Sequence, residues 1–243
     1  MQTLFTNPKV DPSQHPDLNQ YFAFGISVDC VVFGYDGVDV KVLLIKRGTE
    51  PFLDYQAIPG DLVHPKEDAV TATQRVLKDL TGLQNIYLEQ LQTFAGVDRH
   101  PLGRVATIAY FSLLRIEDYN PKPSSWATDA QWTPIQQLGE MAFDHKEIFD
   151  VALERLQRRV RHKPVGFELL PTEFTLTDLQ HLYEKLLNTH FDKANFRKKI
   201  LAMGLLLPLE KMRKAVRYRP ARLYQFDPNR YEALSNRGFH FEL

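Results

Sequence analysis

The sequence predicts an α/β protein built from two units, a layered unit of strands and helices followed by a smaller, basic unit of two helices and a hairpin. Runs rich in β-branched and aromatic residues alternate with amphipathic helical stretches over the first two thirds of the chain. Pro164 and Gly166 then interrupt the pattern. Beyond them positive charge accumulates, although the 243 residues together carry a formal net charge of zero.

The composition is that of an ordinary globular protein. With 44% hydrophobic and 25% charged residues, the 243 residues can form one large or two modest domains. The single cysteine, Cys30, lies in an apolar run and cannot form an internal disulfide, which favours a reducing compartment. The longest apolar stretch, Leu201–Leu209, is interrupted by Gly204 and Pro208, and the N-terminus lacks the pattern of a signal peptide. We therefore expect a cytoplasmic protein with no membrane partner.

The strands of the first unit begin with a hairpin. Phe24–Tyr35 and Val38–Ile45 are rich in β-branched and aromatic residues, and the Asp36-Gly37 turn between them is a strong hairpin signal. Three further strands are expected at Asn85–Phe94, Arg104–Leu114 and Ala130–Pro134.

Two amphipathic helices complete this unit. In Asp68–Thr81 the apolar residues recur at three- and four-residue spacing, and Gly82 is a natural stop. Phe143–Val160 has a similar apolar face, and Asp144 and Glu147 at its start have the spacing of a capping box. One helix between strands and one closing helix predict an α/β/α sandwich.

The second unit begins with two short helices. The first lies within Glu173–Leu187, where Thr175 and Asp178 again have capping-box spacing. Asp192 caps the second, Lys193–Met203, which is basic and carries an asparagine. Two short helices with a basic second member favour a helix-turn-helix.

A basic hairpin follows the two helices. Leu206–Met212 and Arg222–Phe226 are strand-like and flank the cationic tip Arg213–Arg219. This is the layout of a winged helix-turn-helix, in which the second helix enters the major groove of DNA and the wing touches phosphates. The expected DNA contacts are Lys193, Asn195, Arg197, Lys198, Arg213, Lys214, Arg217 and Arg219. The alternative is a basic helical cap that packs on the first unit.

The charge balance supports a polyanionic partner. Between Asp192 and Arg222 we count ten lysines and arginines against two acidic residues, so this segment carries ten minus two, or plus eight, and the remainder carries minus eight.

The loops of the first unit hold the candidate small-molecule contacts. Arginines beside aromatic residues suit a phosphorylated or ribose-bearing ligand, because guanidinium groups pair with phosphate and rings stack on a base. The candidates are Arg47, Phe52, Tyr55, Asp61, Asp98, Arg99 and Arg104. The alternative for each charged residue is a surface salt bridge. We assign His64 and His145 to ordinary structural roles, because neither has a neighbouring carboxylate pair or nucleophile in sequence.

The stretch Gly60–Leu83 resembles the Nudix box, the signature of a family of diphosphate hydrolases. The matching positions are Arg75, Leu77, Gly82 and Leu83. Val76, Asp79 and Leu80 replace the glutamates that should follow the arginine. Nudix hydrolysis needs clustered carboxylates, because magnesium demands hard oxygen ligands. The resemblance thus implies a Nudix-like fold whose hydrolytic site is lost, with no catalytic residue, metal or cofactor.

Across nearly its whole length, the chain resembles the Nudix-related transcriptional regulators, the NrtR-like family. The matching segments are Gly60–Leu83, Asp98–Leu114, Ala142–Ile148, Phe174–Leu187, Phe191–Leu201 and Pro220–Phe226. The resemblance implies a homodimeric repressor or activator with a small-molecule sensor and a winged helix that binds a palindromic DNA operator. It implies a Nudix-like domain over residues 1–162, a linker over 163–172 and a DNA-binding domain over 173–243.

Known members of this family respond to ADP-ribose or to sugars. Asp98, Arg99 and Arg104 fall on the family's ligand motif. The family commonly has aromatic residues around the turn before the box, and their replacement here by residues that include Asp61 slightly favours a neutral sugar or another metabolite, because a carboxylate repels a diphosphate.

Two other functions remain open from sequence. One is an active Nudix pyrophosphohydrolase with an accessory domain, which would gather magnesium through Glu67, Asp79 and either Asp61 or Asp68. The other is a ligand-binding adaptor that contacts protein rather than DNA.

Overall fold

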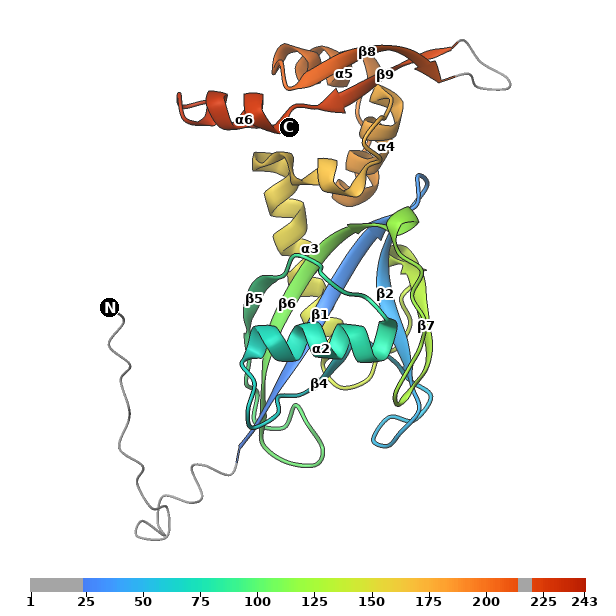
Figure 1. Cartoon of the computed structure of the whole chain (residues 1–243), viewed down its shortest axis with the longest axis vertical. Helices are drawn as coiled ribbons and strands as arrows, with labels where there is room; N and C mark the ends of the chain where they lie inside the picture. Colours follow the sequence, from blue (N-terminus) through green and yellow to red (C-terminus); the bar gives the residue numbers. More distant parts are fainter. Residues whose placement is uncertain (1–23, 214–219) are drawn as a thin grey trace.

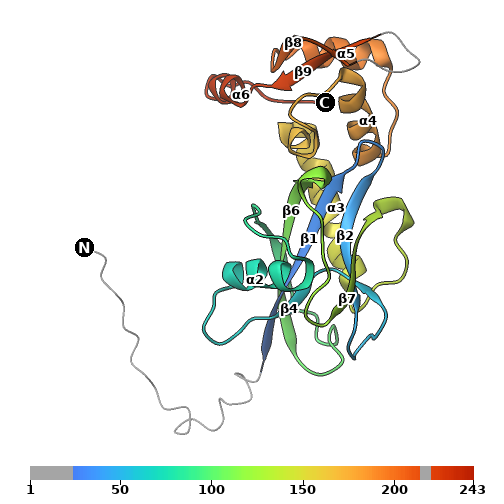
Figure 2. The ribbon, with the colours of Figure 1, turned by 45° about the vertical axis from the view of Figure 1, so that its right-hand side comes forward.

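The computed structural model describes residues 24–213 and 220–243, and these form the two units expected from the sequence (Figure 1). Figure 2 shows the strands of the first unit below and the helices and hairpin of the second unit above. Within the described ranges, no helix is long and apolar enough to span a membrane.

A mixed sheet of seven strands forms the centre of the first unit. The strands are β1 (Gly25–Tyr35), β2 (Val40–Arg47), β3 (Gln56–Ala57), β4 (Gly60–Leu62), β5 (Glu89–Phe94), β6 (Val105–Arg115) and β7 (Ala127–Pro134). The main order is β3-β2-β1-β6-β5, with β4 paired to β1 and β7 paired to β2. The predicted β1–β2 hairpin is confirmed, and β1 and β6 run parallel over their whole length. The strand expected from Asn85 begins only at Glu89, because Asn85 has a φ of 56° and breaks the extended run.

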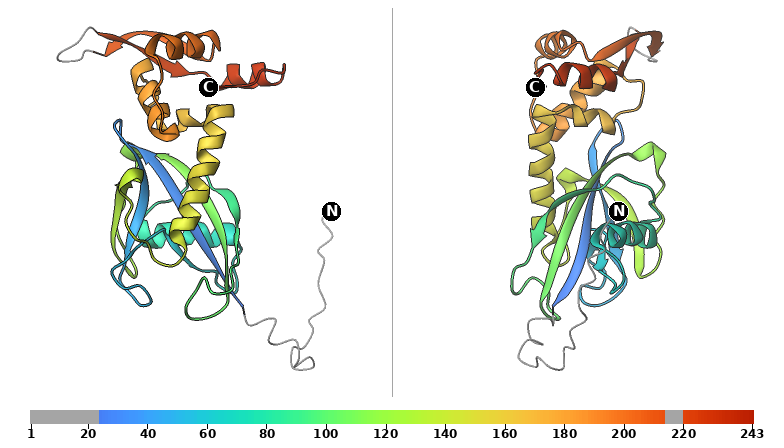
Figure 3. Two further views of the ribbon diagram at one scale, coloured as in Figure 1. Left: turned by 180° about the vertical axis from the view of Figure 1, so that it is seen from behind. Right: turned by 60° about the vertical axis from the view of Figure 1, so that its left-hand side comes forward.

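Helices α2 (Ala69–Thr81) and α3 (His145–His162) cover opposite faces of this sheet, as Figure 3 shows. Alternate residues of β1 point to the two sides: Val28, Cys30 and Val32 pack towards α2, whereas Val31, Phe33 and Tyr35 pack towards α3. The predicted α/β/α sandwich is therefore confirmed. Gly82 ends α2 in the left-handed region, with a φ of 77°, as its position in sequence predicts.

The predicted capping box at the start of α3 is wrong. Asp144 is the N-cap residue, but its side chain makes no hydrogen bond to the helix, because both carboxylate oxygens accept hydrogen bonds from Arg99. The corresponding prediction for the next helix is confirmed, since Thr175 and Asp178 form a complete capping box.

The second unit has the expected winged-helix layout plus one further helix. Its elements are the short 3₁₀ helix η5 (Pro164–Leu169), α4 (Leu176–Leu187), α5 (Lys193–Ala202), the antiparallel strands β8 (Leu206–Arg213) and β9 (Ala221–Phe226), and α6 (Pro228–Ser235). Sequence analysis missed α6, although Asp227 is a typical N-cap and Pro228 a typical first helical residue.

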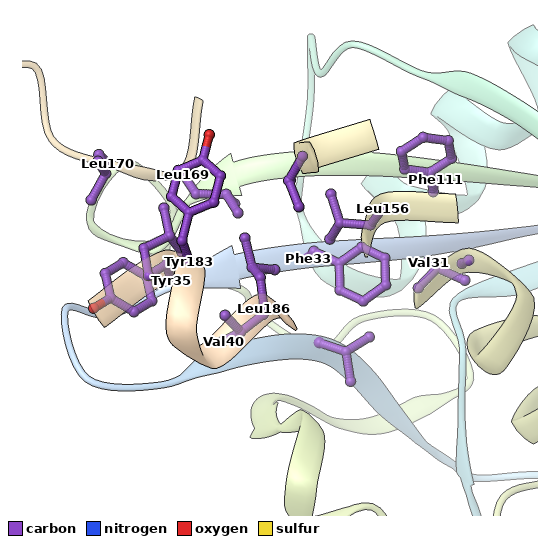
Figure 4. Packing of buried hydrophobic residues seen from close by; sticks show 14 of the residues in the cluster. Val31, Phe33, Tyr35, Val40, Phe111, Leu156, Leu169, Leu170, Tyr183 and Leu186 are labelled. Atoms are coloured by element: carbon purple, nitrogen blue, oxygen red, sulfur yellow. The ribbon is translucent and has the colours of Figure 1, made fainter. Parts of the chain in front are cut away.

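One apolar cluster joins the two units. It runs from Phe33 on the sheet through Leu156 of α3 to Tyr183 and Leu186 of α4, as the close view in Figure 4 shows. Gly166, in the connection, lies against Tyr183, and a Cβ atom there would sit 3.1 Å from the tyrosine ring. The two units therefore share a core, while the domain limits given above remain a prediction.

Candidate effector and nucleic-acid sites

A cavity of about 240 Å³, the polar cavity, lies where β1 and β6 begin, beside β4. The polar residues in its wall come from strands, loops and the start of α3. Its lining is Ser27, Asp29, Arg47, Thr49, Gly60, Asp61, Leu62, Arg99, His100, Leu102, Val105, Thr107, Trp126, Phe143 and His145. Some of these positions lie more than a hundred residues apart in sequence, and the fold of the sheet brings them together.

Arg99 is the central cation of the polar cavity, and its side chain is only 6% exposed. Its Nε and Nη2 donate to the two carboxylate oxygens of Asp144 at 2.7 and 2.6 Å. Its Nη1 donates to Thr107 Oγ1 at 2.5 Å, and its Nη2 lies 3.9 Å from Asp29 Oδ2. The guanidinium is thus enclosed by two carboxylates and a hydroxyl.

Asp29 is buried on β1 beside Gly60. A Cβ atom at position 60 would lie 1.7 Å from Asp29 Oδ1, so only glycine fits there. Burial raises the pKa of Asp29 to about 7, because desolvation of the carboxylate outweighs the attraction of Arg99. Asp29 can therefore change its charge near neutral pH.

His145 is a buried neutral group in the same wall. Burial, with help from the positive charges of Arg99 and Arg47, lowers its pKa to about 3. Its Nδ1 accepts a hydrogen bond from the backbone N–H of Ile58 at 2.9 Å, which leaves the proton on Nε2, 3.6 Å from Asp29 Oδ1. The structural role expected from sequence for His145 stays a prediction, because the ring also lines the polar cavity beside Asp29.

Aromatic rings form one side of the polar cavity. The Arg47 guanidinium lies 4.9 Å from the centroids of both Trp126 and Phe143. His100 stacks on Phe143, with ring centroids 5.0 Å apart and planes at 14°. Burial, followed by the charge of Arg99, lowers the pKa of His100. The wall therefore combines a cation with flat faces on which a ring can stack.

Three of the seven residues chosen from sequence line the polar cavity, namely Arg47, Asp61 and Arg99. Phe52 lies outside the lining and packs against Phe143, while Tyr55 is 43% exposed.

The other two choices also lie outside the lining. Asp98 is exposed, and Arg104 donates to the backbone carbonyls of Ala95 and Gly96 at 2.8 and 2.6 Å, so its guanidinium is used to hold its own loop. Their role as effector contacts stays a prediction.

Sequence reasoning missed Asp29, Thr107 and Asp144. One signal was available in sequence: Asp29 is an acidic residue inside an apolar strand pattern. A buried charge needs a partner, so this pattern predicts that a cation lies beside Asp29. Nothing in sequence links it to Asp144, more than a hundred residues away, because only the packing of α3 on the sheet brings the two together.

The helix that carries the degenerate Nudix box places its apolar replacements in the core. Val76 and Leu80 are each 1% exposed and pack between α2 and the sheet, so they offer no metal ligand. Glu67 is held by Arg75, whose Nη2 donates to Oε1 at 2.7 Å, and this bond lowers the pKa of Glu67 to about 2. Asp79 is half-buried. Within residues 24–213 and 220–243, no three histidine, cysteine or acidic side chains cluster as a metal site would require.

In the second unit, the expected DNA contacts lie mainly in solvent. Lys193, Asn195 and Lys198 are exposed on α5. Arg197 is half-buried, and its Nη2 donates to Thr177 Oγ1 at 3.1 Å. Arg213 pairs with Asp178 at 2.8 Å.

A basic cleft of about 720 Å³ lies between α4, α5 and the hairpin. Its cationic lining residues are Lys193, Arg197, Arg213 and Arg222. The remaining expected contacts, Lys214, Arg217 and Arg219, lie outside the described residues. The cleft therefore offers four cations, with Asp178 opposing them, on the surface expected to meet DNA.

Comparison with protein families identifies both units. The family described as "NUDIX domain" matches residues 23–152, and the family described as "NrtR DNA-binding winged helix domain" matches residues 166–226. The chain belongs to the NrtR family. This member is a DNA-binding transcriptional regulator with a Nudix domain followed by a winged helix, as the resemblance in sequence implied.

Individual relatives agree with this assignment. The "ADPR responsive transcriptional repressor NtrR" of Acinetobacter baylyi is 30% identical over 220 residues, which cover 89% of this chain and 85% of the relative. The crystal structure of Shewanella oneidensis NrtR complexed with a 27mer DNA matches with a TM-score of 0.68 and 30% identity, over 84% of this chain and 94% of that one. An "ADP-ribose pyrophosphatase" of Methanocaldococcus jannaschii is 34% identical over 116 residues, 46% of this chain and 68% of the relative.

Proposed function

We propose that this NrtR family member binds an ADP-ribose-like nucleotide in the polar cavity and uses that binding to control the affinity of its winged helix for a DNA operator. The observation that carries the proposal is the polar cavity itself, where a buried guanidinium and a stacking wall meet in a domain that shares its core with the winged helix. The relatives support it, since one is described as ADPR responsive and another is complexed with DNA.

The chemistry of the polar cavity favours an anionic nucleotide over a neutral sugar. Arg47 and Arg99 provide charge for a diphosphate, while Trp126, Phe143 and His100 provide faces for a ring. A neutral sugar can also pack on these rings, but it has no charge for the two guanidinium groups to neutralise. The repulsion expected from Asp61 is offset by two arginines, because Asp61 interacts with the charge of Arg47 and lies 4.0 Å from Arg75 Nη1.

The Nudix domain serves as a sensor rather than a hydrolase in this proposal. Two of the three glutamate positions that follow Arg75 in the box are buried aliphatic residues, and Glu67 is already bound to that arginine. Such a helix gives magnesium too few carboxylates to activate water against a diphosphate. The pyrophosphatase relative favours the rival function, so hydrolysis must be tested directly.

The test for hydrolysis is incubation of the full chain with ADP-ribose and Mg²⁺, with AMP release followed by chromatography. We expect no turnover above the buffer blank. Turnover that disappears in Asp79→Asn but persists in Asp118→Asn, an exposed carboxylate on another element, would establish the hydrolase.

The test for regulation starts with selection of the preferred DNA from a random pool. We propose a homodimer, so the selected sequence should contain two half-sites about one helical turn apart. Affinity for that DNA is then measured by fluorescence anisotropy with and without ADP-ribose. A protein that binds ADP-ribose but whose DNA affinity is indifferent to it would contradict the proposal. Binding to the DNA that does not weaken steeply with salt would instead favour an adaptor that contacts protein.

A further inference from the structure

The contact between Arg99 and Asp144 links the polar cavity to the start of α3. Asp144 is the N-cap residue of this helix, and its backbone carbonyl already accepts the first helical hydrogen bond, from Ile148 N at 3.1 Å. Its side chain nevertheless makes no cap bond, because Arg99 holds both of its oxygens. The residue is thus placed to cap the helix but is bound elsewhere.

Arg99 has no free fork for an anion in this arrangement. One edge of the guanidinium, Nε with Nη2, is filled by Asp144. The other edge faces Thr107 and Asp29. A phosphate reaches its strongest geometry with arginine through two parallel N–H donors, and so it must replace a group already present.

We propose that Asp144 is the group which an anionic effector displaces from Arg99, and that the released carboxylate then caps α3. This inference rests on the function proposed above. Asp144 would make the polar cavity selective for anions, because only a negatively charged ligand can compete with its carboxylate for Arg99. Aspartate is a strongly preferred N-cap, and its oxygen would accept from a backbone N–H in the first turn. Glu147 stands at the third helical position, where a capping box places its acidic partner. The capping box of Asp144 and Glu147, which does not form in this structure, would then form in the effector-bound protein.

The far end of α3 lies against the winged helix. Gln157 Nε2 donates to the carbonyl of Leu186 in α4 at 2.8 Å, and Leu243 N donates to the carbonyl of Arg161 at 3.1 Å. Leu156 belongs to the same apolar cluster as Leu186, as Figure 4 shows. The 18 residues of α3 span about 27 Å. A change at its first turn therefore reaches α4 as movement of one rigid element, whose course is visible in Figure 3.

Phe143 ties the same helix start to the cavity wall. It precedes the N-cap with a φ of 53°, in the left-handed region that phenylalanine adopts only at some cost. Its ring stacks on His100 and lies 4.9 Å from the Arg47 guanidinium. A ligand that stacks in the polar cavity would press on Phe143 while its phosphate competes with Asp144, so both contacts act on the beginning of α3.

The experiment compares Asp144→Asn with Asp150→Asn, a matched change of an exposed α3 carboxylate that pairs with Lys146. Calorimetry gives the affinity for ADP-ribose, and fluorescence anisotropy gives the ratio of DNA affinities without and with it. Asparagine still caps a helix but holds Arg99 weakly. We expect Asp144→Asn to bind ADP-ribose about tenfold more tightly, because the ligand no longer has to displace a carboxylate from Arg99. We also expect its ratio of DNA affinities to approach one, because the coupling between the two sites is then lost. Asp150→Asn should match the wild type in both.

Weaker ADP-ribose binding in Asp144→Asn, or an unchanged DNA-affinity ratio, would overturn the inference while leaving the proposed function intact. Wild-type protein that does not bind ADP-ribose would overturn both. If Asp144→Asn does not fold, hydrogen exchange in the wild type decides: ADP-ribose should slow exchange of the amides of residues 146 and 147, the second and third helical positions, from which an N-cap side chain accepts. Slowed exchange over 99–107 with no change at 146 and 147 would contradict the displacement.

Discussion

In the Nudix domain, Arg99 is 6% exposed and its charge is balanced by carboxylates brought from other elements, whereas in the winged helix Lys193 and Lys198 extend into water from one short helix. The difference follows from the two kinds of ligand. A small anion is held strongly in a cavity shielded from water, where the dielectric constant is low and a few fixed charges have large effects. A DNA backbone is held by many solvated cations, each of which contributes little.

The largest expected effect comes from removing the buried cation. Arg99→Met leaves Asp144 and Asp29 without their partner, so we expect the free energy of unfolding to fall by about 3–5 kcal/mol and ADP-ribose binding to be lost. Urea denaturation and calorimetry measure the two quantities. Arg158→Met is the control, because its guanidinium is exposed and pairs with Glu154 in solvent, and it should remain close to the wild type. Equal losses in the two variants would remove the distinction between buried and solvated charge within the Nudix domain.

The second prediction concerns the core that connects the compared regions. In Gly166→Ala the new methyl group would lie 3.1 Å from the Tyr183 ring, which is closer than ordinary packing allows. We expect a loss of about 1–3 kcal/mol in the free energy of unfolding and a weaker effect of ADP-ribose on DNA affinity. Gly139→Ala, with nothing within 4 Å of the added atom, is the matched control. If both variants respond to ADP-ribose like the wild type, the shared core does not couple the units.

The two regions also differ in what their sequences could predict. Amphipathic spacing, the Asp36-Gly37 turn and the Thr175 capping box predict the long strands and most helices, because they act through neighbours along the chain, but they do not predict the short strands β3 and β4 or the helix α6. The expected DNA contacts on α5 also follow from sequence, because its basic residues lie close together along the chain. The partners of Arg99 were not predicted, because burial and convergence of distant strands create them.

The Asp144 side chain shows why a local rule can fail. Its spacing to Glu147 is correct for a cap, yet the buried guanidinium of Arg99 attracts the carboxylate more strongly than a backbone amide does. The helix α6 was missed for the opposite reason: its Asp227-Pro228 signal was present in sequence, but its apolar pattern is too weak to predict a helix.

The third prediction tests the solvated region. Lys198 is exposed, so Lys198→Ala should leave thermal stability unchanged, weaken DNA binding by up to about tenfold and lower the salt slope of binding by about one. Lys66→Ala, an exposed lysine near α2, should change neither quantity. Arg197→Ala should weaken DNA binding and also cost stability, because it breaks the bond to Thr177. A change in ADP-ribose affinity in Lys198→Ala would mean that the two sites cannot be separated.

The smallest effect is expected in the pH dependence of stability, where two buried groups of the polar cavity oppose each other. The pKa of Asp29 is raised from 3.8 to about 7, so between these values the folded protein holds a proton that the unfolded chain lacks, and stability falls as pH rises. The pKa of His145 is lowered from 6.5 to about 3, so there the unfolded chain holds the extra proton and stability rises with pH.

The two slopes cancel in the wild type over their common range, between pH values of about 4 and 6.5, and each alone cannot exceed about 1.4 kcal/mol per pH unit. We expect Asp29→Asn, which keeps only the histidine contribution, to gain stability with rising pH. His145→Gln, which keeps only the carboxyl contribution, should lose it. Urea denaturation at several pH values measures both slopes, with Asp118→Asn as a solvated control. Slopes of the same sign in the two variants would show that burial does not favour the neutral forms of these two groups, and the contrast between the two regions would then rest on Arg99 alone.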